Sequence, residues 1–140
     1  MIKRDIIQAQ IEQLGKVLGK GLALVLGLNN EGNILNVVEE IQTILAEQNI
    51  DLKKWIRLEQ LEYEKALKEK MLNNEQVLEQ LGDLLFELGR GCTPEGELRQ
   101  QYLEKALWTF NYISQISITF SMERLLKIKE IKEALGKEFT

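Results

Sequence analysis

The chain has 140 residues, which is enough for one domain with a hydrophobic core. Its net charge of −4 and the lack of a basic stretch argue against nucleic-acid binding, because phosphate contacts require clustered lysines and arginines. The chain has a single proline, and this scarcity of a helix-breaking residue favours helix almost throughout. Its single cysteine excludes an intramolecular disulfide. The absence of histidine removes the commonest general base and the commonest metal ligand. We therefore expect an all-α protein of the cytoplasm that is not an enzyme and has no catalytic residues, no cofactor and no metal.

The first predicted element is an amphipathic helix over residues 1–28. Gly15 and Gly19 lie beside its apolar stripe, where the missing side chains would let another helix approach. With Gly21 they cost about 1 kcal/mol each relative to alanine, so packing has to stabilise this helix. The stripe follows alternating spacings of four and three and consists of Ile7, Ile11, Leu14, Leu18, Gly21, Val25 and Leu28.

Three interpretations of this stripe are open. The stripe covers the protein's own core, associates with a second copy or a partner, or lies on a membrane surface. A membrane-surface helix would favour more basic residues on its polar face than Lys16 and Lys20. The apolar run 21–28 is far shorter than the about 20 residues of a membrane span, and Asp5 and Glu12 interrupt a signal peptide. We predict an association or docking helix over 1–28 and a helical-hairpin domain over 33–140.

Turn and capping residues divide the rest of the chain into five more predicted helices. Asn33, Asp51 and Thr93 are suited to N-caps, and Gly89 and Gly136 to C-terminal caps. No stretch shows a convincing strand alternation. Short turns make sequential neighbours antiparallel, so we expect about six helices stacked as consecutive hairpins. The five helices are expected over 34–48, 52–72, 75–88, 94–117 and from 120 to 135.

Residues 78–113 resemble a tetratricopeptide repeat. The first helix of that repeat has a Leu-Gly pair between large apolar residues, and the second has a small residue four positions before an aromatic one. About a dozen extra residues separate the two halves here. The resemblance implies stacked helical hairpins and a protein-binding role, and it transfers no ligand-binding residues. The matching positions are Leu78, Leu81, Gly82, Leu85, Gly89, Ala106 and Phe110.

The amino end resembles small uncharacterised bacterial all-helical proteins of unknown function. The matching residues are Arg4-Asp5-Ile6-Ile7 and the following Gln10-Ile11-Glu12-Gln13-Leu14. This second resemblance implies a helical fold and no particular activity.

An aromatic pair is the second candidate interaction surface. Trp108 and Tyr112 are spaced i, i+4 outside the main apolar side of the predicted helix 94–117, so we expect them to touch on a second face. Either this helix is buried on both sides, or the pair is exposed and forms a hot spot for a partner.

Cys92 is the one residue that could support chemistry. Arg90 and a predicted helix start after Pro94 would both lower its thiol pKa, but no histidine is present to act as a base. We interpret it as an inert loop cysteine, with a redox-sensitive thiol as the alternative.

These observations favour a non-enzymatic interaction module. We expect it to self-associate, with a homodimer as one outcome, or to dock a protein partner through the stripe and the Trp108–Tyr112 face. The alternative is an accessory or regulatory protein that binds a small apolar ligand between its helices. Neither nucleic acid nor integral membrane association is expected.

Overall fold

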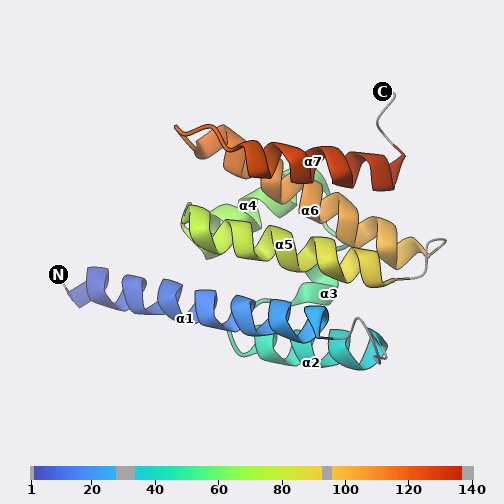
Figure 1. The fold of residues 1–140 in the computed structure, drawn as a ribbon. Helices are drawn as coiled ribbons and strands as arrows, with labels where there is room; N and C mark the ends of the chain where they lie inside the picture. The colour runs from blue at the N-terminus through green and yellow to red at the C-terminus, as the bar shows by residue number, and fades with distance from the viewer. Residues whose placement is uncertain (1, 28–33, 93–95, 137–140) are drawn as a thin grey trace.

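The computed structural model describes residues 2–27, 34–92 and 96–136, and this part of the chain contains seven helices and no strand (Figure 1). The all-α prediction is confirmed. Leu28, Asn33, Thr93 and Pro94 lie outside the described residues. The helices are α1 (Ile2–Leu26), α2 (Ile34–Ala46), α3 (Leu52–Trp55), α4 (Gln60–Met71), α5 (Glu75–Gly91), α6 (Glu97–Ile116) and α7 (Met122–Leu135).

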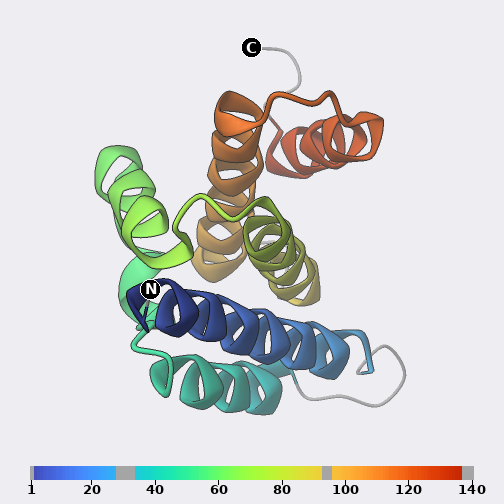
Figure 2. The same ribbon diagram turned by 90° about the vertical axis from the view of Figure 1, so that its left-hand side faces the viewer.

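Helix α5 is the centre of the fold. It packs most extensively against α6 and then against α1, while α7 covers another side of α6 (Figures 1 and 2). Its strongly apolar faces explain this position, because Leu78, Leu81, Leu84 and Leu88 are all fully buried. Helix α1 therefore packs on a helix that is distant in sequence as well as on its neighbour α2.

Two glycines allow α5 and α6 to approach each other closely. A Cβ atom on Gly82 would lie 2.6 Å from Cζ of Phe110, and one on Gly89 would lie 2.7 Å from Cδ2 of Leu103. Both distances are too short for real carbon contacts, so neither position has room for a side chain. The predicted helix end at Gly89 is therefore wrong: α5 continues to Gly91, and Gly89 serves helix packing rather than capping.

The predicted helix 52–72 is also wrong, because the chain changes direction between α3 and α4. Asp51 caps α3 as predicted, accepting a hydrogen bond from the Lys54 amide at 3.3 Å. The break lets α3 pack against α2 while α4 reaches α6. Trp55 and Tyr63 join the two pieces through an edge-to-face contact with ring centroids 6.0 Å apart. At the end of α7, Gly136 is left-handed (φ 72°), as a C-terminal cap requires.

Candidate interaction surface

The carboxyl-terminal part of the α1 stripe lies in the chain's own core. Leu14, Leu18 and Val25 are buried, and Gly21 faces Leu84 of α5, whose Cδ2 is 3.5 Å from the position of a Cβ atom. This part of the stripe therefore follows the interpretation in which the first helix covers the core. The helix that approaches Gly15 and Gly19 is α5, because its Gln80 lies over both glycines.

The amino-terminal part of the same stripe extends past the core. Figure 1 shows the beginning of α1 projecting beyond the beginning of α5 and the end of α2. Ile6 and Ile7 are 52% and 46% exposed, and Ile11 is half-buried. A stripe that starts in solvent and ends in the core leaves apolar side chains available for a partner.

A groove of about 840 Å³ runs along this projecting end. We call it the amino-terminal groove. Ile7, Ile11 and Leu72 supply its large apolar side chains at the end nearest the chain start, while Glu12 and Lys16 are its charged residues. Neutral amides supply most of its polar lining: Gln8, Asn74, Gln76 and Gln80. A second groove of about 340 Å³, between α1 and the α2–α3 turn, also includes Ile7, Ile11 and Leu72. The same three residues are therefore accessible from both sides of α1.

Leu72 occupies an unusual backbone position for a leucine. It is the C-terminal cap of α4 in the left-handed conformation (φ 51°), which glycine normally adopts at a helix end. The left-handed conformation costs a residue with a Cβ atom roughly 1 kcal/mol. Leu72 is nevertheless 47% exposed, so the turn holds an apolar side chain at the grooves rather than in the core.

The Trp108 and Tyr112 rings are both engaged with other residues. Tyr112 is 8% exposed, and its hydroxyl donates to Oδ1 of Asn73 at 2.6 Å. Trp108 is half-buried, with its ring 5.9 Å from that of Tyr63 and the Lys105 ammonium 4.5 Å above it. This placement fits the interpretation in which α6 is buried on both sides.

Buried tyrosines make the fold sensitive to alkaline pH. The Tyr63 hydroxyl is hydrogen-bonded to the Thr109 hydroxyl at 2.7 Å. Burial raises the pKa of Tyr63 well above its usual range. Burial likewise raises the pKa of Tyr102 to about 12. An unfolded chain releases both protons near pH 10, whereas the folded chain keeps them.

We therefore expect the free energy of unfolding to decrease as the pH rises above about 10, by up to about 1.4 kcal/mol per pH unit for each buried tyrosine. Urea unfolding between pH 8 and 11.5 measures this dependence. The Tyr102→Phe variant should show a shallower decrease over the same range. Equal slopes for the two proteins would contradict the assignment to Tyr102.

Cys92 lies at the end of α5 rather than at the start of the next helix, since α6 begins at Glu97 after its N-cap Gly96. Its thiol donates to the Leu88 carbonyl at 3.2 Å. Burial raises the pKa of Cys92, and the nearby Arg99 only partly opposes this. The predicted lowering of its pKa by a following helix is therefore wrong, and the thiolate is disfavoured.

A second exposed apolar surface, not predicted from the sequence, lies where α6 passes into α7. Ile118, Phe120 and Met122 are 100%, 74% and 59% exposed. They alternate with Ser117, Thr119 and Ser121. This alternation could have marked the segment as more than a helix break. We call residues 117–122 the α6–α7 connection.

The described residues contain neither a group of acidic or cysteine side chains able to hold a metal ion nor a helix long and apolar enough to cross a membrane. No protein-family model matches the chain, and the searches found no similar curated protein or solved structure.

Proposed function

We propose that the protein is a non-enzymatic helical interaction module that binds protein surfaces, including those of its own copies, through the amino-terminal groove. The observation that supports this function is the continuation of one apolar stripe from the core into solvent. Leu18 is fully buried, whereas Ile7 on the same stripe is 46% exposed. A partner that covers Ile7 and Leu72 would complete the burial that the fold begins.

The lining of the groove suits a protein partner. Large apolar side chains provide the area to be buried, at about 25 cal/mol per Å². The amides of Gln8, Gln76 and Gln80 can donate to and accept from backbone groups of a bound segment. These amides avoid the desolvation penalty of a buried charge, and the two charged residues of the lining, Glu12 and Lys16, are both exposed.

The tetratricopeptide-like arrangement is part of the same proposal and concerns α5 and α6. Its support is the contact of the Phe110 ring with Gly82, the small-residue position of the Leu-Gly pair. In such arrays helical hairpins display protein-binding surfaces rather than catalytic sites.

Replacing Ile7 with glutamate should convert an associated protein into a monomer. The substitution introduces a charge that would have to be desolvated in the interface. Light scattering after size exclusion should give about twice the chain mass of 16.2 kDa for the wild type and 16.2 kDa for Ile7→Glu.

Ala9→Glu is the matched control, because Ala9 is exposed on α1 and does not line either groove described above. It should leave the wild-type mass unchanged. Equal masses for wild type and Ile7→Glu would count against the amino-terminal groove as the association surface.

A further inference from the structure

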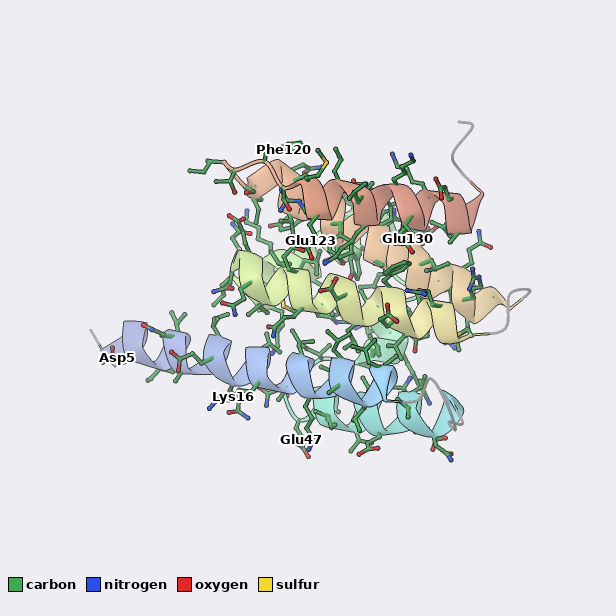
Figure 3. All side chains as sticks on the ribbon, in the orientation of Figure 1. Asp5, Lys16, Glu47, Phe120, Glu123 and Glu130 are labelled. Carbon is green, nitrogen blue, oxygen red and sulfur yellow. The ribbon has the colours of Figure 1, made fainter. Side chains whose placement is uncertain are left out.

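Two apolar surfaces from distant parts of the sequence lie at one end of the molecule. The beginning of α1, the turn between α4 and α5, and the α6–α7 connection are all at the left of Figure 1 and face the viewer in Figure 2. Figure 3 labels Asp5 at the beginning of α1 and Phe120 beside the start of α7, on opposite sides of α5. The start of α5 lies between the amino-terminal groove on one side and the α6–α7 connection on the other.

The two exposed apolar surfaces at this end together approach the area that one partner contributes to a stable interface. Six large apolar side chains are exposed at this end of the molecule, and we call them together the apolar end. They correspond to roughly 750 Å² of exposed surface, at about 200 Å² for each fully exposed large side chain. Each of the two surfaces taken alone is within the size usual for a patch on a monomer, whereas together they approach the about 800 Å² that a stable interface takes from each partner. The residues and their exposed fractions are Ile6 52%, Ile7 46%, Leu72 47%, Ile118 100%, Phe120 74% and Met122 59%.

The two halves of the apolar end are chemically complementary. The α6–α7 connection has the sequence Ser117-Ile118-Thr119-Phe120-Ser121-Met122 and contains no charge. It offers protruding apolar side chains and hydroxyl groups. The amino-terminal groove is concave and combines large apolar side chains and neutral amides with one exposed pair of opposite charges, Glu12 and Lys16. Because the inserted segment carries no charge, its burial in the groove would not desolvate an ionised group of that segment.

An acidic chain is a poor ligand for an anionic lipid surface. The net charge is −4, Asp5 is exposed in the first turns of α1, and the Glu123 side chain is 82% exposed in the first turn of α7. In the sequence, Lys3 and Arg4 only balance Asp5 and Glu12, so the beginning of α1 has no excess of basic residues to attract anionic headgroups. A protein partner that presents an uncharged segment needs no such excess.

We infer that a second copy of the chain covers the apolar end, with the α6–α7 connection of each copy lying in the amino-terminal groove of the other. A two-fold axis through this end exchanges groove and connection, so both contacts form in one closed dimer and no open polymer results. The inference rests on the proposed function, because it names what occupies the groove.

A charge-exchange experiment tests this pairing directly. Each contact of the homodimer contains position 7 of one copy and position 120 of the other. Ile7→Glu or Phe120→Lys therefore places a charge in both contacts, and each should raise the dimer dissociation constant at least tenfold. A one-to-one mixture should form a heterodimer, because one contact is then unaltered and the other brings Glu at position 7 opposite Lys at position 120. Analytical ultracentrifugation with one variant fluorescently labelled measures the heterodimer.

Two further variants serve as controls. Mixing Ile7→Glu with Phe120→Glu should restore less heterodimer, because that pair brings two negative charges together. Leu61→Glu replaces a leucine that is 83% exposed on α4 and lies outside the apolar end, and it should dimerise like the wild type. Circular dichroism checks that all variants are folded.

The remaining outcomes separate the two proposals. If Ile7→Glu dissociates the dimer and Phe120→Lys does not, the connection does not occupy the groove, and only the inference is overturned. The inference is likewise overturned if both variants are monomers and mixing restores no dimer. If Phe120→Lys alone dissociates the dimer, or if the wild type is a monomer at the highest concentration, both the inference and self-association through the groove are overturned.

Discussion

Replacing Gly82 with alanine should lower the free energy of unfolding by about 1–2 kcal/mol. The new Cβ atom would lie 2.6 Å from Cζ of Phe110, a rigid and fully buried ring that has no free space to enter. Overpacking of this kind costs about 1–3 kcal/mol, and more in the tightest cases, against a gain of about 1 kcal/mol from the better helix propensity of alanine. Urea unfolding measures the difference.

The same substitution at Gly19 should have the opposite effect. A Cβ atom there would lie 3.6 Å from the amide nitrogen of Gln80, which is an ordinary contact with the end of a flexible side chain. Gly19→Ala should therefore stabilise the protein by about 0.5–1 kcal/mol. If both alanines stabilise, the close packing of α5 on α6 is contradicted. A double variant, Gly82→Ala with Phe110→Leu, should lose less than the sum of its single changes, because leucine vacates the ring's position.

Local signals in the sequence were sufficient for the fold class and for several helix ends. Asp51 and Gly136 could be recognised because capping depends on the residue itself and its immediate neighbours. The break between α3 and α4 could not be recognised, since the apolar spacing over 52–72 suits one continuous helix equally well. Gly89 was misassigned for a related reason: glycine is favoured both at helix ends and at close helix contacts, and only the position of Leu103 distinguishes them.

The candidate site was less accessible from the sequence than the fold. Ile7 and Leu18 belong to one stripe with one periodicity, yet the first is exposed and the second is fully buried. What separates them is how far α5 and α2 extend along α1, which is a property of tertiary packing. The exposure of Phe120 also depends on how α7 docks. Its alternating context was visible in the sequence, but alternation alone does not show which face remains uncovered.

Helix α7 is held in place by a buried arginine, and its replacement should cost more stability than replacement of the more exposed Lys127 on the same helix. Arg124 is 6% exposed. Its guanidinium donates to Glu79 at 3.0 Å, to Ser114 at 3.1 Å and to the Thr119 carbonyl at 3.4 Å, so it links α5, α6 and the α6–α7 connection. Arg124→Met should lower the free energy of unfolding by about 3 kcal/mol, because the ion pair of the buried guanidinium with the half-buried Glu79 is lost together with its hydrogen bonds to Ser114 and Thr119.

Lysine at position 124 should not restore this stability, since its single ammonium cannot reproduce the three-way contact of the planar guanidinium. Lys127→Met is the milder control: Lys127 contacts Asp83 at 2.8 Å from a more exposed position, so its loss should cost about 1 kcal/mol. Hydrogen exchange should show the amides of α7 losing protection first in Arg124→Met. Equal losses of stability in Arg124→Met and Lys127→Met would show that the arginine does not anchor the helix. If it does, the Arg124→Met variant also loosens the α6–α7 connection, and dimer formation should weaken even though no residue of the apolar end has been changed.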